Sequence, residues 1–127
     1  IAKEVIGIEI VAEAIEAAKI NAKTNGLTNC RFIAGDVLVE LDNLTEKPDL
    51  IILDPPRAGI HPKALEKVIQ IGAPRIIYVS CQPASLAKDL KILAERGYNA
   101  TTIKCMDMFP HTPHIEVVTL LTKCSAT

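Results

Sequence analysis

The sequence has no tryptophan, and its 127 residues include only two phenylalanines and two tyrosines. Its core must therefore be aliphatic. No apolar stretch approaches the roughly 18 residues that a membrane-spanning helix needs, so no membrane partner is expected. An excess of charge is also lacking, because 14 basic residues face 15 acidic ones. Without a strongly basic surface, we do not expect this chain to bind RNA tightly by itself.

Cysteine motifs are lacking as well. The four cysteines match no CxxC spacing of the kind that binds a metal or carries out redox exchange. No signal peptide precedes them, so we expect reduced thiols and a cytoplasmic protein. They lie at Cys30, Cys81, Cys105 and Cys124.

The composition, with 49% hydrophobic and 23% charged residues, is that of one globular domain. Periodicity predicts strands at 4–10, 30–34, 49–53, 75–79, 98–106 and 115–121. Helices are predicted over 12–24, after Pro62 and after Pro83. This alternation favours an α/β fold whose parallel sheet has helices on both faces. The last two strands leave no room for a helix between them, so one of them should be antiparallel.

Several polar residues follow the predicted strands directly. In an open α/β sheet, ligands bind beyond the carboxyl ends of the strands. An acidic residue there, such as Glu9, can accept hydrogen bonds from both hydroxyls of a ribose, and Asp36 could contact an adenine amino group. Each also has an ordinary interpretation, as a solvated carboxylate or as a turn former after Gly35. The residues at strand ends are Glu9, Asp36, Asp54, Ser80 and Cys81.

The segment Asp54-Pro55-Pro56-Arg57 predicts a stiff loop, because its two prolines supply no backbone donor. Such a loop could hold a flipped base or the edge of a cofactor, although an ordinary strand-ending turn is the alternative. Methyltransferases that act on exocyclic amines carry an aromatic residue after the two prolines. Arg57 stands there instead, which disfavours that chemistry.

Cys81 lies at the end of a predicted strand, just before a helix N-terminus. The helix dipole and the unpaired N–H groups there favour a thiolate, which is a good carbon nucleophile. The alternative is a small buried apolar residue, and we give that interpretation to the other three cysteines.

The segment from His111 to Glu116 is dense in titratable groups. His111 and His114 stand three apart on a proline-broken loop with no third ligand, so no metal site is predicted. We favour structural or substrate-contacting roles for His111 and His114. Glu116 begins a strand, where burial would make its carboxylate a stronger base for proton abstraction. A surface position is the alternative.

Taken together, four stretches resemble the C-terminal catalytic domain of the RNA uracil-5 methyltransferases that use S-adenosyl-L-methionine (AdoMet). The resemblance implies a Rossmann-like class I methyltransferase sheet, mostly parallel with one antiparallel strand. It also implies RNA as the partner, either tRNA or rRNA, in the full-length enzyme. The matching stretches are Ile8-Glu9, residues 52–59, residues 78–83 with Leu86-Ala87, and residues 107–116.

The resemblance also implies a role for each site residue. Cys81 is similar to the nucleophile that adds to C6 of uracil, and Glu116 to the base that removes the C5 proton. AdoMet contacts are implied for three carboxylates, of which Asp54 also lies near the target base. Further substrate contacts are expected from Arg57, Gln82 and His111. The three carboxylates are Glu9, Asp36 and Asp54.

Two features depart from the family pattern. Gln82 stands where the family usually has asparagine, which could shift a contact to the base. The glycine-rich first strand and loop, which hold the methionine end of AdoMet, should precede Ile1. We therefore expect residues 1–127 to be a partial catalytic domain that binds AdoMet weakly and is inactive alone.

Two rival functions remain open. An RNA cytosine-5 methyltransferase also uses a cysteine and C6 addition, but the Asp54 loop and the Glu116 segment argue against it. A non-catalytic domain that binds RNA or protein is the other alternative. The presence of an acid, a base and a nucleophile at all the expected positions argues against such a degenerate domain.

Overall fold

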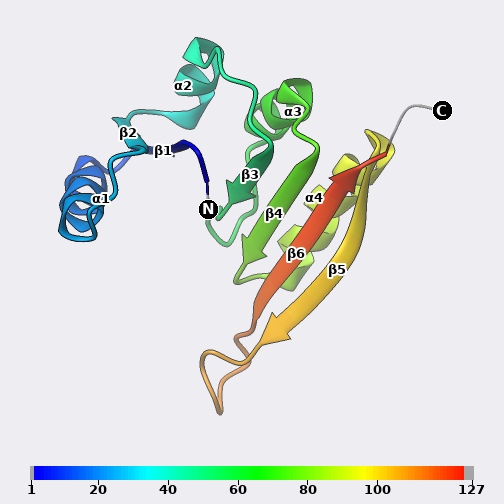
Figure 1. The fold of residues 1–127 in the computed structure, drawn as a ribbon. Helices are drawn as coiled ribbons and strands as arrows, with labels where there is room; N and C mark the ends of the chain where they lie inside the picture. The colour runs from blue at the N-terminus through cyan, green and yellow to red at the C-terminus, as the bar shows by residue number, and fades with distance from the viewer. Residues whose placement is uncertain (1, 125–127) are drawn as a thin grey trace. The chain divides into compact units, whose positions relative to one another are not determined.

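The computed structural model describes residues 2–124 (Figure 1). Backbone contacts divide the chain into two compact units, one ending at Thr45 and the other beginning at Glu46. We call them the N-terminal unit and the C-terminal unit and describe each by itself.

The N-terminal unit is built on two parallel strands. β1 (Val5–Glu9) pairs with β2 (Cys30–Ala34), so that Glu9 lies opposite Ala34. Parallel neighbours need a crossover connection, and α1 (Ala12–Thr24) provides it. Only Ile15 and Ala22, both from α1, are buried among the described residues of this unit.

A short helix, α2 (Val37–Asn43), follows β2 and was not predicted from the sequence. It begins at Asp36, whose Oδ1 accepts a hydrogen bond from the Leu38 N–H at 2.8 Å. Aspartate is a favoured N-cap because its carboxylate satisfies an otherwise unpaired helix donor. None of the residues of α2 is buried. The helix has no buried face, so its sequence needs no apolar periodicity by which it could be predicted.

The C-terminal unit contains a four-stranded sheet in the order β3-β4-β6-β5 (Figure 1). β3 pairs with β4 in parallel, and β6 is antiparallel to both of its neighbours. The expected mostly parallel arrangement with one antiparallel strand is therefore confirmed. The elements are β3 (Leu50–Leu53), α3 (Pro62–Ile71), β4 (Arg75–Ser80), α4 (Pro83–Glu95), β5 (Tyr98–Met106) and β6 (Glu116–Lys123).

The core of this unit lies between one face of the sheet and the two helices. Alternate residues of β4 and β6 are buried on that face, where Ile76 pairs with Leu121 and Tyr78 pairs with Thr119. The expected aliphatic core is present, but both tyrosines are part of it. Tyr98 is fully buried and donates a hydrogen bond to the Ala73 carbonyl at 2.8 Å. The helices contribute Ala64, Leu65, Val68, Ile69, Leu86 and Leu93.

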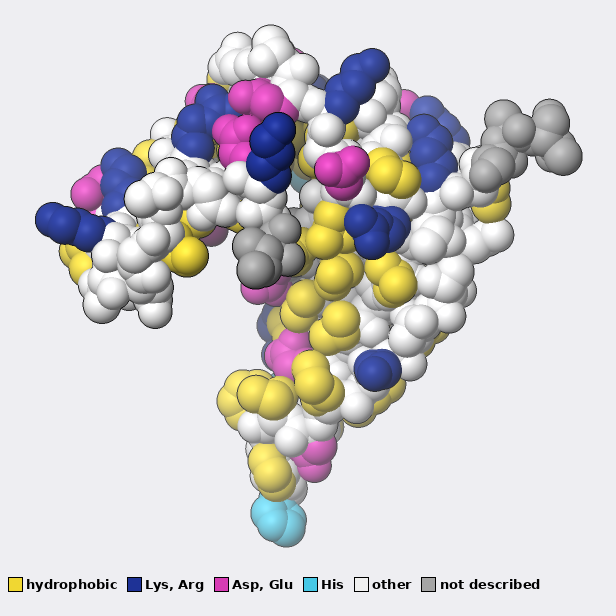
Figure 2. Space-filling model, in the orientation of Figure 1, with side chains coloured by type: hydrophobic (Ala, Val, Ile, Leu, Met, Phe, Trp, Pro, Cys, Tyr) yellow, Lys and Arg dark blue, Asp and Glu magenta, His cyan; other side chains and the backbone are white. Residues whose placement is uncertain are grey.

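The other face of this sheet, which we call the open face, carries no helix of the C-terminal unit (Figure 1). We predicted helices on both faces, but α3 and α4 lie on the same one. Ile52 on the open face is 65% exposed, and hydrophobic side chains gather over these strands (Figure 2). Other apolar residues of the open face are Leu50, Ile77, Val79, Val118 and Leu120.

Among the described residues, none of the helices has the length and apolar character that a membrane span requires.

Candidate functional site

Cys81 lies in the turn that joins β4 to α4. Ser80 ends the strand, and its hydroxyl both accepts a hydrogen bond from the Gln82 N–H and donates one to the Gln82 carbonyl, each at 3.1 Å. Gln82 is the N-cap residue of α4, and Pro83 begins the helix. This closed turn holds the half-buried Cys81 between the sheet and the helix N-terminus, as the sequence predicted.

Glu116 is the first residue of β6 and is half-buried. The last pair between β4 and β6 joins Ser80 to Val117. Cys81 follows Ser80 in the turn after β4, and Glu116 precedes Val117 on β6, so both residues adjoin the Ser80–Val117 pair. Because Val117 is buried on the helix-covered face, Glu116 is directed to the open face. The structure therefore brings these two predicted residues to the same end of the sheet.

The Asp54 loop, residues 54–60, begins at that same end. Leu53, the last residue of β3, is level with Tyr78 in the parallel β3–β4 pair, and β4 ends two residues later at Ser80. Asp54 and Arg57 are exposed. A turn is closed by the hydrogen bond from the Gly59 N–H to the Pro56 carbonyl at 2.9 Å. Gly59 has a φ of +86°, a conformation that glycine adopts without strain.

The Asp54 loop is tied to the N-terminus of α4 by its own backbone and side chains. Arg57 Nη2 donates to Gln82 Oε1 at 3.4 Å. The Ser85 hydroxyl lies 2.9 Å from the Arg57 carbonyl oxygen and 3.0 Å from that of Gln82. Arg57 and Gln82 are thus brought together with the turn that carries Cys81.

His111 lies in the loop between β5 and β6, which extends past the same end of the sheet (Figure 1). It is exposed and adopts a φ of +66°, at the third position of a turn that the Thr112 N–H closes onto the Phe109 carbonyl at 3.2 Å. Pro110 precedes it, as is usual in type II turns. His111 makes no hydrogen bond or ion pair within residues 2–124, so it stands outside the network of Arg57 and Gln82.

Glu9 and Asp36 lie together at the carboxyl end of the sheet in the N-terminal unit. The Gly35 N–H donates to the Glu9 carbonyl at 3.0 Å, which joins the ends of β1 and β2. Glu9 Oε1 accepts from the Val11 N–H at 2.9 Å, and Asp36 Oδ1 caps α2. A carboxylate has about four acceptor sites, so each can still accept ribose hydroxyls or an amino group. Both residues therefore fit the nucleoside part of AdoMet.

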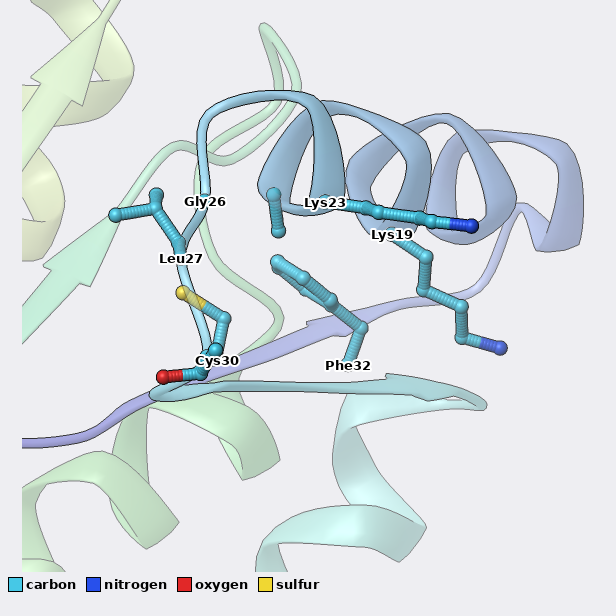
Figure 3. Close-up of a pocket in the computed structure, with 8 residues that line it drawn as sticks. Lys19, Lys23, Gly26, Leu27, Cys30 and Phe32 are labelled. Atoms are coloured by element: carbon cyan, nitrogen blue, oxygen red, sulfur yellow. The ribbon is translucent and has the colours of Figure 1, made fainter.

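The N-terminal unit also has an open pocket of about 270 Å³ (Figure 3). Phe32 and Cys30 extend from β2 toward the end of α1, while the Lys19 and Lys23 side chains extend away along the helix (Figure 3). This pocket lies by the C-terminus of α1 and the start of β2, whereas Glu9 and Asp36 lie at the other end of the strands. We do not assign it to the candidate site.

Three residues that support the site were not found by sequence reasoning. Asp89 of α4 is only 7% exposed, and its Oδ2 accepts hydrogen bonds from the Tyr78 hydroxyl at 2.5 Å and from the Ile60 N–H at 2.9 Å. Burial, and then the hydrogen bond to Asp89, raise the pKa of Tyr78 well above its usual range. Ser85 is the third of these residues. Only Asp89 had a signal in the sequence, because it is a charged residue on the apolar stripe of α4, between Leu86 and Leu93.

Metal ligation has no support in this part of the chain. Within residues 2–124 no group of three or more histidine, cysteine, aspartate or glutamate side chains lies close enough to hold a metal ion.

Comparison with known proteins gives a consistent family. The family model for tRNA (uracil-5-)-methyltransferases matches residues 36–124. An uncharacterized RNA methyltransferase of Clostridium tetani is 58% identical over 117 residues, which cover 92% of this chain and 26% of the relative. Another, from Caldanaerobacter subterraneus, is 52% identical over 97% of this chain and 27% of its own length. The chain thus spans about a quarter of the length of these curated relatives.

A solved structure shows the same fold. The Pyrococcus abyssi tRNA (uracil-54, C5)-methyltransferase, in complex with S-adenosyl-L-homocysteine, superposes with a TM-score of 0.81 at 36% identity. The match covers 94% of this chain and 29% of that protein. The predicted Rossmann-like methyltransferase fold is therefore confirmed.

Proposed function

We propose, from the premise that this chain belongs to the tRNA (uracil-5-)-methyltransferase family, that it is part of an enzyme that methylates C5 of a uridine in tRNA or rRNA. AdoMet would supply an electrophilic methyl group. The Pyrococcus abyssi protein supports this cofactor, because S-adenosyl-L-homocysteine is what AdoMet becomes after it gives up its methyl group. An RNA substrate fits the cytoplasmic location predicted from the sequence.

The proposed reaction begins with Cys81. C5 of uracil is a poor nucleophile, so covalent activation divides one difficult step into easier ones. The Cys81 thiolate adds to C6, and the electron pair of the C5–C6 bond moves into an enolate that makes C5 nucleophilic. Once C5 carries the methyl group, Glu116 takes the C5 proton. The electron pair of that C–H bond reforms the C5–C6 double bond and expels the Cys81 thiolate.

The observation that carries this proposal is the register of β4 and β6. Since Ser80 pairs with Val117, Cys81 in the turn after β4 and Glu116 at the start of β6 both adjoin that pair. One uracil ring has to meet both residues, because the thiol acts at C6 and the base acts at the neighbouring C5. A nucleophile directly after β4 and a base at the start of the adjacent β6 support the proposal that one ring meets both.

The remaining residues have supporting roles in the proposal. Arg57 and Gln82, joined by a hydrogen bond, would contact the target base together with Asp54, and His111 would contact RNA from the β5–β6 loop. Since the base is stacked in the RNA, it must flip out to reach Cys81. The carboxylates that would hold the nucleoside part of AdoMet are Glu9, Asp36 and Asp54.

The test uses the whole protein with RNA that carries 5-fluorouridine. Fluorine at C5 cannot leave as a proton, so the reaction should stop at a covalent protein–RNA adduct. We expect Cys81→Ala to form no adduct and to lose methylation by a factor of about 10³ or more. With ordinary uridine, Glu116→Gln should accumulate the adduct that wild type does not. Cys105→Ala, an exposed residue outside the site, should match wild type.

The outcomes separate the rival functions. Methylation of cytidine in place of uridine would support the cytosine-5 alternative. RNA binding without methyl transfer by wild type would support the non-catalytic one. Retained uridine methylation in Cys81→Ala would disprove the covalent route.

Thiol reactivity gives a second measurement on the chain itself. Cys81 is half-buried, whereas Cys105 and Cys124 are exposed, so the buried position predicted for those two cysteines was wrong. Access alone therefore predicts that Cys81 is alkylated more slowly. A thiolate at the helix N-terminus predicts the reverse order near neutral pH. Slower alkylation of Cys81 would argue against its activation.

A further inference from the structure

The buried carboxylate of Asp89 has no role in the reaction described above. It belongs to the apolar stripe of α4 that also contains Leu86 and Leu93, both buried. A leucine at position 89 would extend that stripe without burying a charged group, which is costly unless it is well paired. The partners of Asp89 therefore show what it provides that leucine cannot.

Both hydrogen-bond partners of Asp89 lie on segments that lead to the candidate site. Ile60 is the last residue of the Asp54 loop, and its backbone nitrogen lies 2.9 Å from Asp89 Oδ2. The Tyr78 hydroxyl, 2.5 Å from the same oxygen, belongs to β4, which ends at Ser80, directly before Cys81. One carboxylate oxygen thus joins β4, α4 and the Asp54 loop.

Gly59 adds a third contact of a different kind. A Cβ atom added at Gly59 would lie 2.8 Å from Asp89 Oδ2 and 3.3 Å from the Ser85 Cβ. The loop backbone therefore passes directly against α4, and only glycine allows both this approach and the φ of +86°. One turn earlier on the helix, Ser85 reaches the Arg57 carbonyl at 2.9 Å. Two polar residues of α4 hold the loop at two points.

We propose that Asp89 is a positioning residue for methyl transfer: by holding Ile60 and Tyr78 it fixes the Asp54 loop relative to the turn that carries Cys81. Ser85 is its partner in this role. The inference rests on the proposed function, because Asp54 and Cys81 must meet the same uracil ring. Neither Asp89 nor Ser85 contacts substrate in this scheme.

Four variants of the whole protein test the proposal. Asp89→Leu extends the apolar stripe of α4 but removes the acceptor, and Asp89→Asn keeps an acceptor oxygen at nearly the same volume. Ser85→Ala removes the second tether and serves if Asp89→Leu fails to fold. Leu93→Ala is the matched control, because it removes a buried side chain of the same helix, one turn beyond Asp89.

We expect Asp89→Leu to lower kcat about tenfold or more, because misplacing reacting groups by about 1 Å can cost a factor of 10². KM for RNA and for AdoMet should stay within about threefold, and Asp89→Asn should restore kcat to within about threefold of wild type. Ser85→Ala should lower kcat less than Asp89→Leu does. Leu93→Ala should lower Tm and leave kcat unchanged below the unfolding transition.

Hydrogen exchange on the chain itself is the second readout. Asp89→Leu should speed exchange of the Gly59 and Ile60 amides about tenfold relative to those of β6, and Leu93→Ala should change both alike. The proposal is overturned if Asp89→Leu keeps wild-type kcat, or if Asp89→Asn falls as far as Asp89→Leu. A wild type that methylates no uridine would instead defeat the proposed function, and exchange would still decide whether Asp89 holds the loop.

Discussion

The two units hold their candidate residues by different means. In the C-terminal unit, Cys81 directly follows β4 and Glu116 begins β6, in a four-stranded sheet packed against two helices. In the N-terminal unit, Glu9 ends one strand and Asp36 follows the other, and few side chains of this unit are buried. Each of the two carboxylates is oriented by a hydrogen bond from one backbone N–H. The proposed covalent chemistry thus has a rigid support, and the proposed cofactor contacts depend on local hydrogen bonds.

Truncation of a buried side chain in the C-terminal unit and of an exposed one in the N-terminal unit should give the largest difference. Leu121 of β6 is 1% exposed, so Leu121→Ala should lower the free energy of unfolding by about 3 kcal/mol through lost burial and a cavity. Ile20 of α1 is 63% exposed, and Ile20→Ala should change it by less than about 0.5 kcal/mol. Urea unfolding measures both. Equal losses of unfolding free energy would contradict this difference between the units, because they would mean that Ile20 is covered in solution.

The cap of α2 gives the next effect. Asp36→Ala should cost about 1 kcal/mol of local stability, seen as faster hydrogen exchange over residues 37–43. Asp36→Asn should keep the cap, because asparagine caps helices about as well. AdoMet binding by Asp36→Asn then distinguishes a helix cap from a cofactor contact. Wild-type affinity in that variant would reduce Asp36 to a helix cap, whereas weaker binding would support its cofactor contact.

A buried hydroxyl in the C-terminal unit offers a gain in stability. Thr119 is fully buried opposite Tyr78, and its Oγ1 has no hydrogen-bond partner among the described residues. Thr119→Val removes that unpaired group at nearly constant volume, so the free energy of unfolding should rise by about 0.5–1 kcal/mol. Thermal unfolding measures the change. A loss of stability would show that the hydroxyl finds a partner such as a buried water.

A surface ion pair should give the smallest effect. Arg96 donates two hydrogen bonds to Glu66, each at 2.7 Å, and these hold the pKa of Glu66 below its ordinary value of 4.5. A lowered folded pKa contributes stability above the ordinary value and loses it as the pH falls through the folded value. Glu66→Gln should therefore unfold slightly earlier in urea than wild type near neutral pH and like wild type in acid. A difference that persists in acid would point to packing instead of charge.

Much of the fold could be predicted because its periodicity is strong. The helix over 12–24 and the strands over 30–34 and 98–106 were predicted with the bounds that the structure has. α2 was missed because it buries no residue, so a cap alone marks it. The expectation of helices on both faces failed within the C-terminal unit, because periodicity shows that a helix is amphipathic and does not show which face of a sheet it covers.

The candidate site was predicted in part for a similar reason. Residues at strand ends, such as Cys81 and Asp54, follow from the pattern, since parallel strands end at a common edge. The pairing of β4 with β6 does not follow from it, because register depends on contacts between distant segments. Asp89 was missed because its two partners, Ile60 and Tyr78, lie far from it in the sequence.

The position of β6 between β4 and β5 sets an order of events for a chain made from its N-terminus. β4 and β5 are both synthesised before the strand that separates them, so the edge of β4 next to Cys81 has no partner until residues 116–123 arrive. Pairing across such a sequence separation is slow, and an open strand edge invites association between chains. The β5–β6 hairpin therefore completes the sheet last, and Glu116 joins Cys81 only in that final step.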